Sequence, residues 1–157
     1  MTNVALTQAL LAILAILLVV AATIDVRTYT ISNRLNLAVA LLAPLYWLSA
    51  GLPWWPDIAA QAGTALAVFL LLSILFYTGM MGGGDVKLAG ALALWFTPAE
   101  TLRSLIYMAL AGGVVTAVAL IVHRAARKGG RPKVPYGVAI AVGGLAILTQ
   151  RFLNQFA

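Results

Sequence analysis

Long apolar stretches separated by short polar connections extend along the 157-residue chain. Several of them reach the ~20 residues that a transmembrane helix needs. The pattern therefore predicts an all-α, polytopic membrane protein with about six transmembrane helices. The expected ranges are Val4–Ile24, Leu35–Ala50, Ile58–Thr78, Asp85–Phe96, Leu102–Val122 and Val134–Phe152. The second range contains Pro44 and the fourth is short, so these two have the weaker patterns.

The composition agrees with a protein that faces lipid. Hydrophobic residues make up 63% of the chain and charged residues 9%, which is less polar surface than a soluble domain needs. We expect one integral membrane domain over residues 1–157, with no separate soluble domain. Met1 to Gln8 contains no Lys or Arg, and the first apolar run continues to Ile24. We therefore expect a permanent first span and not a cleaved signal peptide.

Basic residues gather in three alternating connections, which must lie on the same side of the membrane. These connections hold eight of the ten Lys and Arg residues: Arg27, Arg34, Lys87, Arg124, Arg127, Lys128, Arg131 and Lys133. The opposite connections, Gly51–Asp57 and Thr97–Glu100, are acidic or neutral. The positive-inside rule predicts that the basic connections are cytoplasmic and both chain ends external. Trp54 and Trp55 are expected at the outer membrane–water interface.

Several kinds of chemistry are excluded by residue types that the chain lacks. It has no cysteine and one histidine, His123, within a basic run. This excludes disulfides, thiolate or histidine metal clusters and a cysteine nucleophile, so we expect no metal and no cofactor. The net charge of +6 would suggest nucleic acid in a soluble protein, but membrane topology explains it better here.

The chain contains four acidic residues, and two of them occupy unusual positions. Asp57 and Glu100 fall in short outer connections and are expected to be ordinary solvated acids, although Glu100 could also favour the start of the next helix. Asp25 and Asp85 each lie at the cytoplasmic end of an apolar span, where ionisable groups are costly and tend to be functional. The alternative is that each acid is an interface residue, solvated or paired with a neighbouring cation, Arg27 or Lys87.

Two carboxylates at the same membrane depth have a specific chemical use. Like charges a few ångströms apart do not both ionise easily, so such a pair shares one proton. One member can then accept a proton from water while the other protonates a carbonyl or a leaving amine. Asp25 and Asp85 are therefore candidates for an aspartic-protease pair.

Three glycines, Gly82 to Gly84, directly precede Asp85. Glycine adopts backbone conformations closed to other residues and lets another chain approach closely, so the cluster is expected to break a helix beside the acid. The alternative is a flexible turn. The stretch fits neither a Walker nor a dinucleotide-binding fingerprint.

Two other functions are open at this point. A small transporter or channel subunit could use the two aspartates as a proton or cation site. A non-catalytic assembly partner of a secretion or pilus machine is the second alternative.

The two aspartate segments resemble those of a known protease family. Gly82-Gly83-Gly84-Asp85 resembles the GxGD motif of membrane-embedded aspartyl proteases. Asp25, followed after five residues by Ile31-x-Asn33, is similar to the first aspartate motif of the type IV prepilin peptidases. Lys87 matches the basic residue that commonly follows GxGD, and Val134–Gly137 resembles a motif at the start of that family's last helix. Ser32 departs from the family, which often has Pro there.

The resemblance implies an aspartic endopeptidase that removes the short basic leader of a prepilin or pseudopilin, ahead of its hydrophobic helix. It also implies cleavage at the cytoplasmic face of the bacterial inner membrane. The catalytic pair would be Asp25 and Asp85, with support from Gly82, Gly84, Lys87, Asn33 and Arg27. With no cysteine and no room for an added domain, the chain resembles the short, peptidase-only members of tight-adherence, or Flp-type, pilus systems. Archaeal preflagellin peptidases are the second resemblance in the same class.

Overall fold

The computed structural model describes residues 3–126 and 133–154. The helices are α1 (Val4–Thr28), α2 (Asn33–Ala50), α3 (Ala59–Tyr77), α4 (Gly83–Ala93), α5 (Pro98–Ala125) and α6 (Tyr136–Asn154), and a short helical segment, η1 (Trp54–Ile58), precedes α3. The described residues contain no strand, so the all-α prediction is confirmed. Three residues of the predicted basic connection, Arg127, Lys128 and Arg131, lie outside the described residues.

Four helical stretches are long and apolar enough to cross a membrane: α1, η1 with α3, α5 and α6. The other two helices fall short for different reasons. α2 contains Pro44 and begins with polar residues, and α4 has 11 residues. At 1.5 Å per residue, α4 is about 16 Å long, whereas the hydrocarbon core is ~30 Å thick. The six-helix membrane fold is therefore confirmed, with four helices able to span by length and composition.

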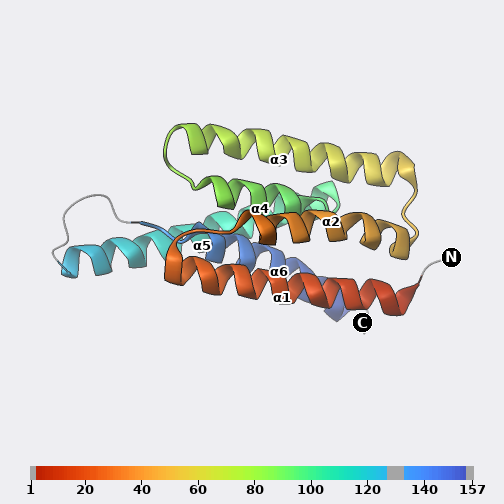
Figure 1. Ribbon diagram of the computed structural model, residues 1–157, viewed down its shortest axis with the longest axis horizontal. Helices are drawn as coiled ribbons and strands as arrows, with labels where there is room; N and C mark the ends of the chain where they lie inside the picture. Colours follow the sequence, from red (N-terminus) through yellow and green to blue (C-terminus); the bar gives the residue numbers. More distant parts are fainter. Residues whose placement is uncertain (1–2, 127–132, 155–157) are drawn as a thin grey trace.

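The alternating connections lie at the same end of the bundle. In Figure 1, α1 and α3 end, and α2 and α4 begin, at the end where α5 ends and α6 begins. α1 begins and α6 ends at the opposite end. The last turn of α1 and the first turns of α4 and α6 therefore meet.

The end of α1 differs from the prediction in a way that matters for Asp25. The helix continues past Ile24 to Thr28, so Asp25 lies in its last turns and not in a loop. Tyr29 ends the helix with a left-handed backbone (φ 54°), and its N–H donates to the Asp25 carbonyl oxygen at 2.8 Å. The Asp25 side chain is thus held by regular helix.

Helix α6 is central, because it packs against α5, α1 and α4. Glycines on α6 let these neighbours approach closely. A Cβ at Gly143 would lie 2.5 Å from the Ser104 carbonyl oxygen, and a Cβ at Gly144 would lie 2.7 Å from Leu18 Cδ1. Small residues at contact points are the usual way in which membrane helices pack. This packing fixes the first turn of α6 relative to α1 and α4.

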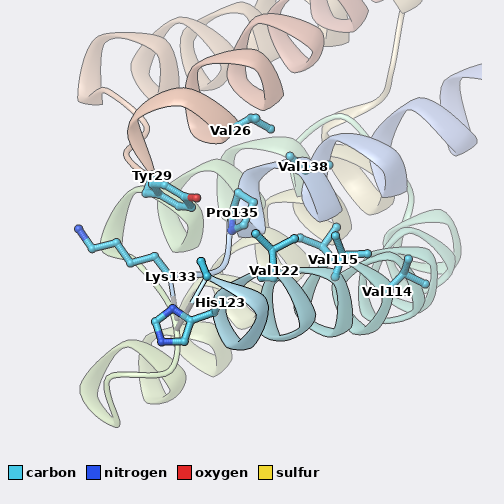
Figure 2. Close-up of a pocket in the computed structure, with 12 residues that line it drawn as sticks. Val26, Tyr29, Val114, Val115, Val122, His123, Lys133, Pro135 and Val138 are labelled. Atoms are coloured by element: carbon cyan, nitrogen blue, oxygen red, sulfur yellow. The ribbon is translucent and has the colours of Figure 1, made fainter. Parts of the chain in front are cut away.

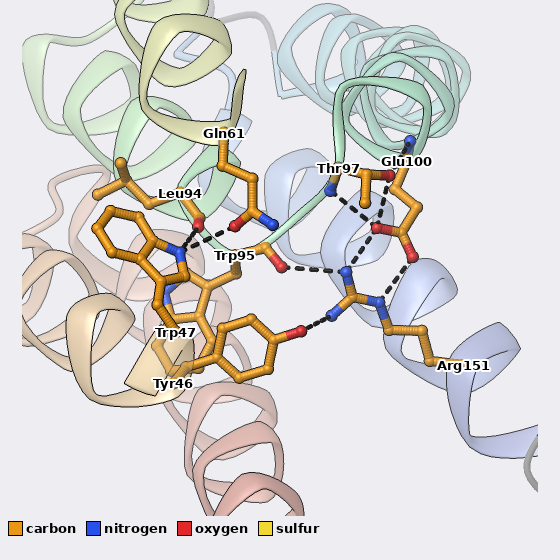
Figure 3. A network of polar contacts seen from close by, with 8 residues as sticks. All are labelled: Tyr46, Trp47, Gln61, Leu94, Trp95, Thr97, Glu100 and Arg151. Atoms are coloured by element: carbon orange, nitrogen blue, oxygen red, sulfur yellow. Dashed lines mark hydrogen bonds and ion pairs between the residues drawn. The ribbon is translucent and has the colours of Figure 1, made fainter. Parts of the chain in front are cut away.

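A polar network ties the other end of the bundle together (Figure 3). Arg151 on α6 donates from Nε to Glu100 Oε1 at 2.7 Å, from Nη1 to the Tyr46 hydroxyl at 3.0 Å, and from Nη2 to the Trp95 carbonyl oxygen at 3.1 Å. Glu100 also forms a capping box with Thr97 at the start of α5. The expected contribution of Glu100 to this helix start is confirmed. The prediction that Glu100 is an ordinary solvated acid is wrong, because the ion pair with Arg151 was not visible from sequence spacing.

This network makes Arg151 a stability determinant. We expect Arg151→Met to lower the free energy of unfolding by about 2 kcal/mol. This is less than the ~3–5 kcal/mol for breaking a fully buried pair, because the Arg151 and Glu100 side chains are 18% and 21% exposed. Unfolding of the purified protein in detergent measures the loss. Arg103→Met, at an exposed position of α5, is the control. Equal stabilities of the two variants would contradict a structural role for the ion pair.

Candidate active site

Asp25 is buried, with 2% of its surface exposed, and it caps another helix. Its Oδ2 accepts a hydrogen bond from the backbone N–H of Gly137 at 2.6 Å. This N–H belongs to the first turn of α6, where backbone N–H groups lack partners within their own helix and form the positive end of the helix dipole. The α6 N-terminus therefore fixes the direction of the Asp25 carboxylate.

Gly137 is needed at this contact because no side chain fits there. A Cβ at this position would lie 2.8 Å from Asp25 Oδ2 and 2.7 Å from Ile31 Cδ1. This gives a physical reason for the glycine of the Val134–Gly137 segment.

Asp85 lies in the first turn of α4 and is 8% exposed. Gly82 is the N-cap of this helix (φ −73°, ψ 144°). Asp85 is in the third helical position, close to the positive end of the helix dipole. A Cβ at Gly82 would lie 2.8 Å from Asp85 Oδ2. Gly82 thus leaves the space that the carboxylate occupies.

The backbone of the glycine cluster differs from the prediction. Among the described glycines, positive φ angles occur at Gly51 and Gly79 and not within Gly82–Gly84. The prediction that the cluster adopts a backbone conformation closed to other residues is therefore wrong. Close approach does occur, but to the protein's own chain. A Cβ at Gly84 would lie 2.8 Å from the Ile31 carbonyl oxygen. Gly84 therefore lets α4 pack directly against the connection between α1 and α2.

The first turn of α2, which follows this connection, also contacts α4 through polar groups. Asn33 Oδ1 accepts a hydrogen bond from Lys87 Nζ at 3.0 Å. Asn36 Nδ2 donates to the Gly84 carbonyl oxygen, also at 3.0 Å. The structure thus brings the predicted residues Asn33 and Lys87 to each other, and they position the helix that carries Asp85.

The two candidate carboxylates are close enough to interact electrostatically, because Asp85 experiences the charge of Asp25. Neither forms an ion pair; within the described residues the ion pair of the structure joins Arg151 and Glu100. The alternative pairing of these acids with Arg27 or Lys87 is thus not observed. Arg27 is exposed in the last turn of α1.

Two residues with clear positions at this site were not predicted as site residues. Asn36 is buried (5% exposed) within the apolar run of α2. A lone amide there, one turn after Asn33, was the available signal. The role of Gly137 depends on a contact between residues 112 positions apart, which no local pattern indicates.

An apolar cavity of about 550 Å³ lies between the end of α1, α5 and the start of α6 (Figure 2). Its lining includes Val26 and Val138, the chain neighbours of Asp25 and Gly137, but neither aspartate. His123 and Lys133 line its polar end. The cavity is thus close in sequence to the Asp25–Gly137 contact and does not contain the carboxylates.

Comparison with known proteins gives one match. No curated protein and no solved structure is significantly similar to the chain. A model of the type IV leader peptidase family matches residues 12–121, which is more than half of the chain and includes both Asp25 and Asp85. The protein therefore belongs to the type IV leader peptidase family.

Proposed function

We propose that this protein is an aspartic endopeptidase that removes the short basic leader of prepilins or pseudopilins at the cytoplasmic face of the bacterial inner membrane. One observation supports this most strongly. Asp25 and Asp85, 60 positions apart in the sequence, are buried together where α1, α4 and α6 meet, and neither has a neutralising cation. The family match adds a peptidase reaction to this geometry.

The proposed reaction uses the pair as general base and general acid. The ionised carboxylate takes a proton from water, and the water oxygen attacks the carbonyl carbon of the scissile bond. The protonated carboxyl donates its proton to the carbonyl oxygen. As the C–N bond breaks, the carboxyl that took the proton from water gives it to the leaving nitrogen, and a hydroxyl of the intermediate returns a proton to the other carboxylate. This gives a new N-terminal amine, a leader with a C-terminal carboxyl group and the carboxylate pair with its one shared proton. The backbone N–H of Gly137 holds the Asp25 carboxylate, and Gly82 leaves the space that the Asp85 carboxylate occupies.

We also infer that the described helices form one peptidase domain, of the kind that serves Flp-type pilus systems. The helices account for nearly all described residues, and the chain has no cysteine. A transporter or channel gains no comparable support, because both aspartates lie in helix-terminal turns at one end of the bundle and not midway along a span.

Cleavage in liposomes tests the proposal. The purified protein, reconstituted with a prepilin, should release the leader, and mass spectrometry of the product should show one new N-terminus. Protein-free liposomes are the control. Proton or cation flux through the protein without any cleavage would instead establish the transporter alternative.

The proposed topology predicts which positions a membrane-impermeant thiol reagent reaches. The chain has no native cysteine, so single cysteines report without background. In spheroplasts, the reagent reaches the outer face of the inner membrane but does not cross it. Trp54→Cys should be labelled there, because Trp54 is 80% exposed and lies at the end of the bundle that the proposed topology places outside. Arg124→Cys, at the end of α5, should react only after permeabilisation. Labelling of Arg124→Cys in intact spheroplasts would refute the cytoplasmic placement of the carboxylate pair.

A further inference from the structure

Asn36 is a buried amide in the first turn of α2, and its contacts leave one of its polar atoms unsatisfied. Its side chain is 5% exposed, and its Nδ2 donates to the Gly84 carbonyl oxygen at 3.0 Å. Within the described part of the chain, its Oδ1 is closed to solvent and has no hydrogen-bond partner. A buried acceptor without a donor lowers stability, so packing alone favours an apolar side chain at this position. Departures of this kind are typical of positions that serve function.

The carbonyl that Asn36 contacts belongs to the peptide group between Gly84 and Asp85. A peptide group is planar, so a contact that fixes its oxygen also fixes where its nitrogen and the next Cα lie. The nitrogen of the same group is held as well, because the Asp85 N–H donates to the Gly82 carbonyl oxygen at 3.1 Å. Both polar atoms of this peptide group thus have partners, and the Asp85 side chain starts from a fixed point.

The backbone of Asn36 leads back toward the other aspartate. Its N–H donates to the Ser32 carbonyl oxygen at 3.2 Å. Ser32 is the last residue of the connection between α1 and α2, and Tyr29 is the first. The Tyr29 N–H in turn donates to the Asp25 carbonyl oxygen at 2.8 Å. Asn36 therefore joins, through a few backbone groups, the helix end that carries Asp25 to the helix start that carries its candidate partner.

We propose that Asn36 is a positioning residue for the peptidase reaction, in which its Nδ2 fixes the Asp85 carboxylate relative to Asp25. This inference rests on the proposed function and deepens it. Asn36 acts on the protein's own backbone, and through that backbone on the carboxylate. Its unsatisfied oxygen is the loss of stability that accompanies this role.

A second polar contact between the same two helices is less suited to the role. Lys87 Nζ donates to Asn33 Oδ1 at 3.0 Å, but both side chains are exposed. Water replaces the partners of exposed groups with little loss, whereas a buried hydrogen bond is electrostatically stronger. The buried bond from Asn36 therefore holds the first turn of α4 more firmly.

Asn36→Leu tests the proposal, because it removes the amide and keeps a side chain that branches at Cγ. We expect kcat for prepilin cleavage to fall about tenfold, since misplacement of a reacting group by about 1 Å can lower a rate by ~10²-fold. The KM should stay unchanged, because a buried positioning residue does not contact the substrate. Kinetics in liposomes at several prepilin concentrations separate the two constants.

The same variant should not lose stability, which sets it apart from an ordinary packing lesion. The unsatisfied Oδ1 disappears with the amide. The Gly84 carbonyl lies inside α4, where the N–H four residues later is its regular partner, so it is not left unpaired. The thermal unfolding midpoint in detergent should therefore equal or exceed that of the parent.

Ser49 provides the matched control, as a buried polar residue near the far end of α2. Its hydroxyl donates to the Tyr46 carbonyl oxygen and accepts from the Thr7 hydroxyl, both at 3.0 Å. Ser49→Ala should keep the kcat of the parent, whichever way its stability changes. If Asn36→Leu inserts poorly, Asn36→Ala removes the amide without adding bulk and should show the same loss of kcat.

The possible outcomes separate positioning from the other roles of a buried amide. A parental kcat in both Asn36 variants would overturn the proposal. A raised KM with unchanged kcat would instead make Asn36 part of a substrate-binding surface. A loss of kcat in Asn36→Leu together with a lowered unfolding midpoint would make it a purely structural residue. In each of these cases the peptidase itself stands, whereas a parent protein that does not cleave prepilin contradicts the proposed function and the inference with it.

Discussion

Asp25→Asn and Asp85→Asn are each expected to lower kcat/KM for prepilin cleavage by about 10³-fold or more, because general acid–base catalysis contributes ~10²–10⁴-fold and needs both members of the pair. Both variants should still fold. An asparagine at position 25 keeps an oxygen that can accept the Gly137 N–H, and one at position 85 has the shape of the aspartate and fits the space that Gly82 leaves. Cleavage at equal protein level in reconstituted membranes measures the loss.

The matched control for this prediction is Asp57→Asn, which should cleave like the parent. Asp57 lies in η1, away from both aspartates along the bundle. Glu100→Gln is unsuitable as a control, because it weakens the network around Arg151 and so changes stability. Substantial activity in either aspartate variant, with correct folding, would exclude the shared-proton pair.

Gly84→Val is expected to reduce cleavage strongly and to lower stability. The valine Cβ alone would lie 2.8 Å from the Ile31 carbonyl oxygen. This oxygen is a backbone atom of the short connection between α1 and α2, so it does not move aside easily. α4 would have to shift away from the end of α1, which separates Asp85 from Asp25. We expect a loss of about 10²-fold in kcat/KM, since ångström-scale misplacement of a reacting group has effects of this size. Prepilin cleavage and the thermal unfolding midpoint should both be measured.

Gly83→Ala is the comparison within the same turn. A Cβ there would lie 3.2 Å from Phe76 Cε2, and an aromatic side chain can yield by a few tenths of an ångström. The effect should therefore be much smaller. If Gly84→Val cleaves as well as Gly83→Ala, the close approach to Ile31 has no part in positioning Asp85.

The sequence was sufficient for the features that depend on local patterns. Apolar length predicted six helices, and the alternation of charge predicted which connections share an end, because both follow from the cost of placing polar groups in lipid. Asp25 and Asp85 could be singled out because the chain has so few acids. The hydrophobic pattern did not predict where α1 ends. Asp25 interrupts the apolar run, but the helix itself continues through Asp25 to Thr28.

Contacts between distant segments were beyond the reach of the same patterns. No residue near Asp25 in the sequence indicates that its carboxylate accepts a hydrogen bond from Gly137. Likewise, no residue near Glu100 indicates that Glu100 pairs with Arg151. Similarly, Asn36 is one amide in an apolar run until the structure places its Nδ2 on the Gly84 carbonyl. Such pairings are set by how the helices pack, which hydrophobic periodicity does not specify.

The shortness of α4 has a consequence for how the chain turns back. α4 ends short of the ends of its neighbours in Figure 1, so the chain turns back toward α5 before it reaches the far end of the bundle. Lipid offers no donors to its carbonyl groups. The Trp47 indole N–H donates to the Leu94 carbonyl and Arg151 to the Trp95 carbonyl, so side chains of α2 and α6 replace the missing water. The end of the bundle opposite the aspartates thereby fixes the position of α4, so substitutions far from Asp85 should also change where its carboxylate lies.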